Sequence, residues 1–200
     1  VLAEAQELGY AEADPTFDVD GIDAAHKLAL LASVAFGCEV DFDNVHVEGI
    51  RHVSAEDIAF ADELGFRIKL LGIANHTPDG IEQRVYPCMV PMDAPLAHVE
   101  GVFNAVVAEG DAVGTSVLQG RGAGAGPTAS AVISDIVDIA RGTILPVFSV
   151  PASQLSVAKT VSIENRFGPY YVRLAVLDRP GVIAGVSAAL RDEEVSVEAL

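Results

Sequence analysis

The sequence has few basic residues, and this scarcity excludes several classes of partner. Lysine and arginine together number 12, against 29 aspartate and glutamate residues, so the formal net charge is −17. The basic residues form no cluster anywhere along the chain. A surface that binds nucleic acid needs such a cluster to neutralise phosphates, and so does a surface that binds anionic lipids. We therefore expect no nucleic-acid partner and no membrane partner.

Cysteine and long apolar runs are also scarce. Cys38 and Cys88 belong to no CxxC motif, which is typical of reduced thiols in a cytoplasmic protein rather than of a disulfide framework. The longest apolar run, residues 28–37, is too short to cross a bilayer and predicts a buried helix. The five histidines lack the spacing of a metal site, so we expect no bound metal.

The first residue is not methionine, and the chain begins in the middle of a secondary-structure pattern. It begins with Val1 inside a helical pattern that has no capping residue before it, and residues 194–200 alternate like the beginning of a strand. We expect this chain to be a piece of a larger protein. Half of its residues are hydrophobic, which is ample material for a core.

The periodicity of apolar residues alternates along the chain between helical and extended segments, which predicts an α/β (α+β) fold. The expected helices are 22–36, 54–65 and 128–141, and the expected strands are 45–50, 67–75, 81–89 and 112–118. Thr77-Pro-Asp-Gly80 is a hairpin signal between two of these strands. We predict a mixed, largely antiparallel sheet with helices 22–36 and 128–141 on one face.

Composition divides the chain into three parts. Residues 1–142 are expected to form one domain, and residues 143–168 are a linker that contains proline and serine. Residues 169–200 have the pattern of a strand at 170–177, a turn at Asp178-Arg-Pro-Gly181, a helix and the start of another strand. This last part is predicted to be a truncated βαβ piece.

Residues 9–27, GYAEADPTFDVDGIDAAHK, place five carboxylates ahead of a single amine. The carboxylates are Glu12, Asp14, Asp18, Asp20 and Asp23, and the amine is Lys27. Asp23 and Lys27 are spaced i, i+4 on the predicted helix, which is also the ordinary geometry of a stabilising surface ion pair. Residues 16–21 mimic the first half of a calcium loop. That loop needs a glutamate at its twelfth position, where this chain has Lys27, so the calcium interpretation fails.

A small amino acid that carries a hydroxyl would satisfy this set of groups. Carboxylates on a turn attract an ammonium group and accept a hydrogen bond from a hydroxyl. A lysine among apolar neighbours can move protons. The alternative is a non-catalytic amino-acid-sensing module with an acidic ammonium-binding pocket. Lys27 separates the two hypotheses, because a sensor of ammonium compounds has no use for an amine among its carboxylates.

The register of Gly9, Asp14-Pro15, Asp18, Gly21-x-Asp23 and Lys27 resembles the diagnostic segment of homoserine dehydrogenases. The resemblance continues at residues 120–136, GRGAGAGPTASAVISDI, and the tail with its DRPG turn resembles the first half of an ACT regulatory domain. It implies interconversion of L-homoserine and L-aspartate 4-semialdehyde with NAD or NADP, in threonine and methionine biosynthesis. It also implies a threonine-type effector at the tail and a Rossmann domain ahead of the acidic segment, so the fragment alone is expected to be inactive. Sheet and helix surfaces of such a domain commonly pair two subunits, and we expect a homodimer.

The resemblance assigns roles to individual residues. It implies that Lys27 transfers a proton at the substrate oxygen, and that Asp23 fixes this amine and helps to hold the substrate. It implies that five residues bind substrate: Gly9, Tyr10, Glu12, Asp18 and Asp23. Gly9 and Tyr10 line the pocket where substrate meets nicotinamide, so Gly9 is also a cofactor contact. Asp14 and Asp20 are interpreted as turn and cap residues.

The glycine-rich run before helix 128–141 has two interpretations. Gly120-x-Gly122-x-x-Ala125 is a loose GxGxxA between a strand and a helix, a context that can cradle phosphate. No acidic residue follows at the end of a next strand, as a dinucleotide fold requires, so a plain glycine-rich bend fits equally well. The resemblance implies that Gly124, with Gly122, approaches the cofactor from the substrate side.

Overall fold

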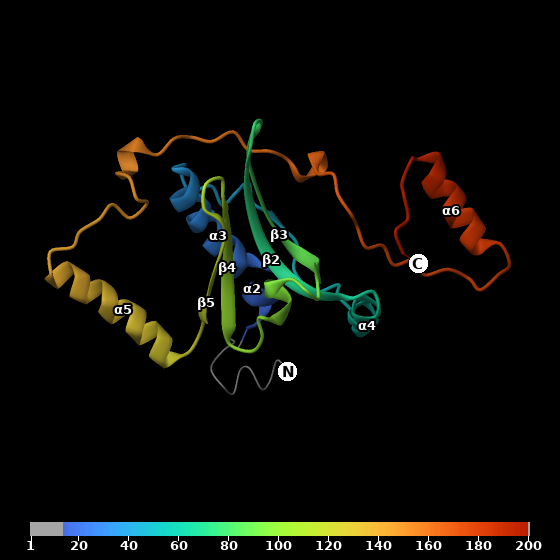
Figure 1. Ribbon diagram of the computed structural model, residues 1–200, viewed down its shortest axis with the longest axis horizontal. Helices are drawn as coiled ribbons and strands as arrows, with labels where there is room; N and C mark the ends of the chain where they lie inside the picture. Colours follow the sequence, from blue (N-terminus) through green and yellow to red (C-terminus); the bar gives the residue numbers. More distant parts are fainter. Residues whose placement is uncertain (1–13, 200) are drawn as a thin grey trace.

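Two antiparallel hairpins form the centre of the computed structural model, which describes residues 14–199 (Figure 1). The first hairpin consists of β2 (Phe66–Thr77) and β3 (Gly80–Pro91), and the short β1 (His46–Val47) extends it in the order β1-β3-β2. The second consists of β4 (Phe103–Gly110) and β5 (Gly114–Arg121), which form a separate two-stranded sheet. The expected mixed and mostly antiparallel α/β fold is confirmed, but as two sheets instead of one.

The β2–β3 hairpin is set by its turn. The two strands pair over their whole length, from Thr77 opposite Gly80 to Phe66 opposite Pro91. The Thr77 hydroxyl donates to the carbonyl of Gly80 at 2.9 Å. Gly80 has φ +143°, and a Cβ there would lie 2.1 Å from the carbonyl oxygen of Lys159. The predicted turn at 77–80 is therefore confirmed, and its last position requires glycine.

Helix α3 (Ile22–Phe36) has the predicted bounds and covers one face of the three-stranded sheet. It begins after Gly21 and ends at Gly37, and both glycines have left-handed backbones that stop a helix from continuing. One stripe of the helix is buried: Ala25, Leu28, Ala29, Ala32 and Ser33. Ala25, Leu28 and Ala29 of this stripe pack with Val45 and Val85 into the core. Because this stripe faces the sheet, the opposite face of α3 is exposed to solvent. Asp23 and Lys27 lie on that exposed face.

Two other predicted helices also form. Ser54 caps α4 (Ala55–Glu63), where its hydroxyl accepts from the amide of Asp57 and the Asp57 carboxylate accepts from the amide of Ser54. This reciprocal capping box satisfies two backbone donors that the helix leaves unpaired. The tail helix α6 (Val182–Asp192) begins after Gly181, which has φ +89°.

Two strand predictions differ from the structure, and one strand was not predicted. The strand expected at 45–50 is only β1, because just His46 and Val47 pair with β3. The segment 98–109, for which the sequence indicated no single element, contains β4. The strand expected at 112–118 begins two residues later, because 111–113 form the turn of the β4–β5 hairpin.

The predicted βαβ tail forms its helix without its strands. Neither 170–177 nor the described residues 194–199 form a strand. A strand exists only where a neighbouring strand takes its backbone hydrogen bonds, and the described part of the chain offers none at these positions.

Helix α5 (Ala125–Ala140) was expected on the same sheet face as α3, and this expectation is wrong. None of its residues is buried, although Ile133, Ile136 and Ile139 lie along it. Figure 1 shows α5 and α6 at opposite ends of the longest dimension of the molecule, joined by the chain that crosses it. Apolar spacing predicts a helix with an apolar face, but it does not say which surface covers that face.

The chain between α5 and α6 is attached to the rest of the molecule at several places. Ser156 and Glu39 form one backbone hydrogen bond of 2.9 Å near the end of α3, and the amide of Ile81 donates to the carbonyl of Lys159 at 2.8 Å. Farther along, the side chains of Tyr171 and Arg173 bind to the start of α4. No helix within residues 14–199 has the length and hydropathy needed to span a membrane.

Candidate active site

Asp23 and Lys27 meet on the solvent-facing side of α3. The Lys27 ammonium donates to Asp23 Oδ2 at 2.5 Å. The Lys27 side chain is 65% exposed and that of Asp23 is 38% exposed. The apolar neighbour Leu28 belongs to the buried stripe and lies on the other side of the helix. The predicted i, i+4 pair is therefore present, but within residues 14–199 apolar side chains do not enclose the amine.

The three acidic residues that precede α3 in the described chain have different surroundings. Asp14 Oδ1 accepts from the amide of Thr16 at 3.0 Å, and hydrogen bonding to Thr16 lowers the pKa of Asp14. Asp20 binds the guanidinium of Arg51 at 2.8 Å, which lowers the pKa of Asp20. Asp18 lies on α2 (Thr16–Val19), with an exposed side chain. Asp14 and Asp20 thus shape the turn, as predicted, and Asp18 and Asp23 present carboxylates at the surface.

The segment 49–51 holds the corner between α2 and α3. Gly49 packs directly on it, and a Cβ at that position would lie 2.3 Å from the carbonyl oxygen of Val19 and 2.4 Å from the Cα of Asp20. The next residue, Ile50, donates its amide to the same carbonyl of Val19 at 2.9 Å. Gly49 and Arg51 were not singled out from the sequence, because their role arises from a contact about 30 residues away along the chain. The three candidates Gly9, Tyr10 and Glu12 lie outside the described residues.

The two candidate glycines of the 120–136 segment differ in what they do. The amide of Gly122 donates to the carbonyl of Val102 at 2.9 Å, and a Cβ on Gly122 would lie 1.7 Å from Nδ2 of Asn104. The side chain of Asn104 is exposed and can rotate away, so this contact does not by itself require glycine at 122. Gly124 is the N-cap of α5, with φ +111°. The first backbone amides of this helix form a surface suited to an anion, such as a cofactor phosphate. Helix α5 makes no extensive contact with another described helix or strand, so the described chain does not join Gly124 to the Asp23–Lys27 pair.

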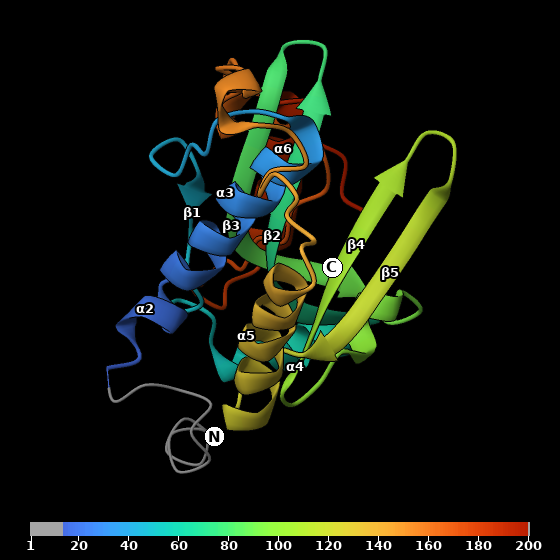
Figure 2. The ribbon, with the colours of Figure 1, turned by 90° about the vertical axis from the view of Figure 1, so that its left-hand side faces the viewer.

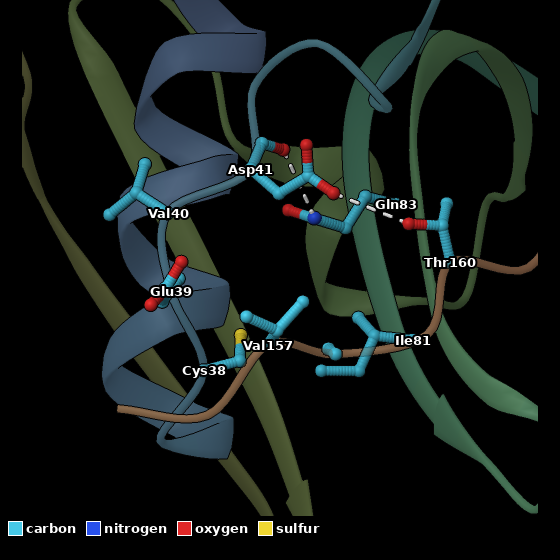
Figure 3. Close-up of a pocket in the computed structure, with 9 residues that line it drawn as sticks. Cys38, Glu39, Val40, Asp41, Ile81, Gln83, Val157 and Thr160 are labelled. Atoms are coloured by element: carbon cyan, nitrogen blue, oxygen red, sulfur yellow. Dashed lines mark hydrogen bonds between the residues drawn. The ribbon is translucent and has the colours of Figure 1, made fainter. Parts of the chain in front are cut away.

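A small cavity lies at the other end of α3, away from the Asp23–Lys27 pair. It has a volume of about 170 Å³ and lies between Cys38, β3 and the segment 157–160 (Figure 3). Asp41 organises its wall: its carbonyl accepts from Gln83 and its carboxylate accepts from Thr160, both at 3.3 Å. Burial raises the pKa of the Cys38 thiol, which keeps it protonated and unreactive. The cavity therefore offers no nucleophile, and among the described residues no group of three metal-binding side chains gathers anywhere.

Known proteins match this chain closely. A family model described as homoserine dehydrogenase matches residues 1–137. A homoserine dehydrogenase from Pseudomonas aeruginosa is 47% identical over 206 aligned residues, which cover 100% of this chain and 48% of the relative. One from Mycobacterium tuberculosis is 48% identical over 204 residues, which cover 98% of this chain and 46% of the relative. The chain thus spans about half the length of the curated relatives that it matches.

Solved structures agree with these sequence matches. A homoserine dehydrogenase from Thiobacillus denitrificans is 45% identical, with a TM-score of 0.82, and the match covers 99% of this chain and 47% of that one. A hyperthermophilic archaeal homoserine dehydrogenase solved in complex with NADPH is 33% identical, with a TM-score of 0.55, over 70% of this chain and 39% of that one.

Proposed function

Because the chain belongs to the homoserine dehydrogenase family, we propose that the protein containing it interconverts L-homoserine and L-aspartate 4-semialdehyde with NAD or NADP. The observation that carries this proposal is the Lys27–Asp23 pair at 2.5 Å on the exposed side of α3. An amine held by a carboxylate beside further carboxylates suits a substrate that carries both an ammonium group and a hydroxyl. The match to this family does not favour the sensing module.

Lys27 is proposed to manage the proton of the reacting oxygen. When homoserine is oxidised, a neutral Lys27 amine accepts the hydroxyl proton; in the reverse direction its ammonium returns a proton to the same oxygen. Asp23 holds the amine in place. The nicotinamide cofactor supplies the acceptor or donor of hydride, while the protein supplies orientation and electrostatics.

The remaining site residues are proposed to bind substrate and cofactor. Asp18, which is exposed on α2, is proposed to bind substrate together with Asp23. Gly124 fits a cofactor contact because it begins a helix of 16 residues, whose first amides favour an anion. Gly122, two residues before Gly124, is proposed to approach the cofactor from the same side. For Gly9, Tyr10 and Glu12 the proposed substrate-binding roles, with Gly9 also touching cofactor, rest on the resemblance alone.

The organisation of the whole protein is also a proposal. We assign residues 1–142 to the catalytic domain, 143–168 to a linker and 169–200 to the start of an ACT-like regulatory domain that takes a threonine-type effector. We propose that the protein is cytoplasmic. We also propose that it forms a homodimer, because α5 and β5 leave large apolar side chains such as Ile133, Ile136 and Leu118 exposed. Apolar surface of this kind is typical of a face that a second subunit covers.

The test is the reaction of the full-length protein. Purified enzyme is mixed with L-homoserine and either NAD⁺ or NADP⁺, and formation of the reduced nicotinamide is followed at 340 nm, with L-serine and D-homoserine as control substrates. We expect reduction with L-homoserine only, and no reduction by residues 1–200 alone. Tight binding of L-homoserine by the full-length protein without any reduction would overturn the proposal in favour of the sensing module.

A further inference from the structure

Three stacked aromatic rings join α2 to α3 beside the Asp23–Lys27 pair. The imidazole of His26 lies 4.0 Å from the ring of Phe42, centroid to centroid, with 9° between the planes. The same imidazole lies 5.7 Å from the ring of Phe17, with 19° between the planes. The rings come from α2, from α3 and from the loop that precedes β1. His26 is therefore stacked with one ring from each of two other segments.

Helix α2 needs such external support. It is four residues long and buries none of its side chains, and a helix of this length is not stable by itself. Only Asp20 and Gly21 connect it to α3, and Gly21 has a left-handed backbone with φ +79°. Figure 2 shows α2 as a short turn at the beginning of α3.

Contacts hold α2 at both of its ends. At its C-terminal end, the carbonyl of Val19 accepts from Ile50, and Asp20 pairs with Arg51. At its N-terminal end, Phe17 is held by the ring of His26. Asp18 lies between the two attachments, so the direction of its side chain depends on both.

We infer that His26 is a positioning residue, which holds α2 through Phe17 so that the Asp18 carboxylate faces the substrate beside Asp23 and Lys27. The inference rests on the proposed function, in which Asp18 binds substrate. His26 acts through the flat faces of its ring, and its stacking on Phe17 and Phe42 involves no proton transfer. A phenylalanine ring at position 26 can therefore replace it, whereas an alanine cannot.

The first test uses the kinetics of the full-length enzyme. Loss of the stack in His26→Ala is expected to raise the KM for L-homoserine about two- to tenfold, while the KM for the nicotinamide cofactor stays at the wild-type value. His26→Phe is expected to restore the wild-type KM, and His98→Ala, at another exposed histidine, serves as the matched control. Equal KM values for L-homoserine in wild type, His26→Ala and His26→Phe would overturn the inference.

A double-mutant cycle then tests whether the effect passes through Asp18. In an Asp18→Asn background, His26→Ala is expected to change the KM for L-homoserine no further, because the group that it positions is already gone. The same loss in both backgrounds would show that His26 acts elsewhere, and would contradict the inference.

Hydrogen exchange provides a readout that does not depend on activity. In the full-length protein, the amides of Val19, Asp20 and Gly21 donate to carbonyls of residues 15–18. These amides are expected to exchange faster in His26→Ala but not in His26→Phe. Unchanged exchange in His26→Ala would overturn the role of the stack even if the enzyme is active. A wild-type protein that does not oxidise homoserine would instead overturn the proposed function, while exchange would still decide whether the stack holds α2.

Discussion

The hydroxyl of Tyr171 donates to Asp57 Oδ1 at 3.0 Å, although the two residues are 114 positions apart. Asp57 is already part of the capping box that starts α4. Arg173 adds a hydrogen bond of 2.5 Å to Ser54 Oγ and lies 3.3 Å from Asp57 Oδ2. The segment that carries Tyr171 and Arg173 is therefore attached to the N-terminus of α4.

Removal of the Tyr171 hydroxyl is expected to loosen this attachment. In Tyr171→Phe, trypsin should cleave faster after Arg173, because the segment spends more time detached. Tyr170→Phe is the matched control, since the Tyr170 hydroxyl bonds only to the nearby carbonyl of Arg166. Equal cleavage rates in Tyr171→Phe and Tyr170→Phe would contradict the prediction. The measurement is the rate at which the full-length protein is cut, followed by mass spectrometry.

Acid is expected to weaken the corner between α2 and α3 through Asp20. Hydrogen bonding to Arg51 lowers the pKa of Asp20 in the folded protein. A carboxyl whose pKa is lower when folded stabilises the fold above its unfolded pKa of about 3.9, and this contribution is lost as the pH falls through the folded pKa. The difference in melting temperature between wild type and Asp20→Asn should thus be greatest near neutral pH and narrow below about pH 4.

Arg51→Gln removes the same ion pair by changing its other partner. The difference in melting temperature between wild type and Arg51→Gln should likewise be greatest near neutral pH and decrease below about pH 4. A difference in melting temperature that stays constant from pH 7 to pH 3 would show that the pair does not contribute in this way. High salt should reduce the effect at neutral pH, because the pair is partly exposed.

A methyl group at position 49 is expected to disturb the same corner by crowding. In Gly49→Ala the new Cβ would meet the carbonyl oxygen of Val19 at 2.3 Å, and the backbone must shift to admit it. We expect the free energy of unfolding to fall by about 1–3 kcal/mol, the usual cost of overpacking. Gly126→Ala in α5 is the control: a Cβ there meets nothing within 4 Å, and alanine favours a helix. Chemical denaturation measures both variants, and equal stabilities would refute the prediction.

Substitution of Lys27 separates a catalytic amine from a surface ion pair. Lys27→Ala in the full-length enzyme should reduce kcat by about 10²- to 10⁴-fold, the range typical of a lost general acid or base. Its stability should change by no more than about 0.5 kcal/mol, because exposed ion pairs contribute little. Lys159→Ala, at another exposed lysine, should keep full activity.

Lys27→Arg sharpens this test, because arginine keeps the positive charge beside Asp23 but does not release a proton near neutral pH. We expect it to be stable and nearly inactive. An active Lys27→Arg enzyme would show that position 27 supplies charge alone, and an active Lys27→Ala enzyme would show that it supplies neither charge nor a proton.

The sequence by itself determined the elements whose causes are local. Gly21 precedes α3 and Gly37 follows it, and their left-handed backbones set the two ends of the helix. The bounds of α3 and the i, i+4 spacing of Asp23 and Lys27 could therefore be predicted together. The Thr77-Pro-Asp-Gly80 turn and the Ser54 cap likewise act on backbone groups within a few residues of themselves. Interactions of this range are complete within a short stretch of chain, and a sequence pattern therefore contains them.

Tertiary structure alone decided which partner each exposed group meets. Arg51 binds Asp20 from 31 positions away, and Phe42 completes the stack on His26 from another segment. The segment 170–177 has the pattern of a strand but forms none, since a strand depends on a neighbour that the described chain does not supply. An ion pair, a ring stack or a paired strand forms between two segments that can be far apart in the sequence. A local sequence pattern describes only one of these two segments.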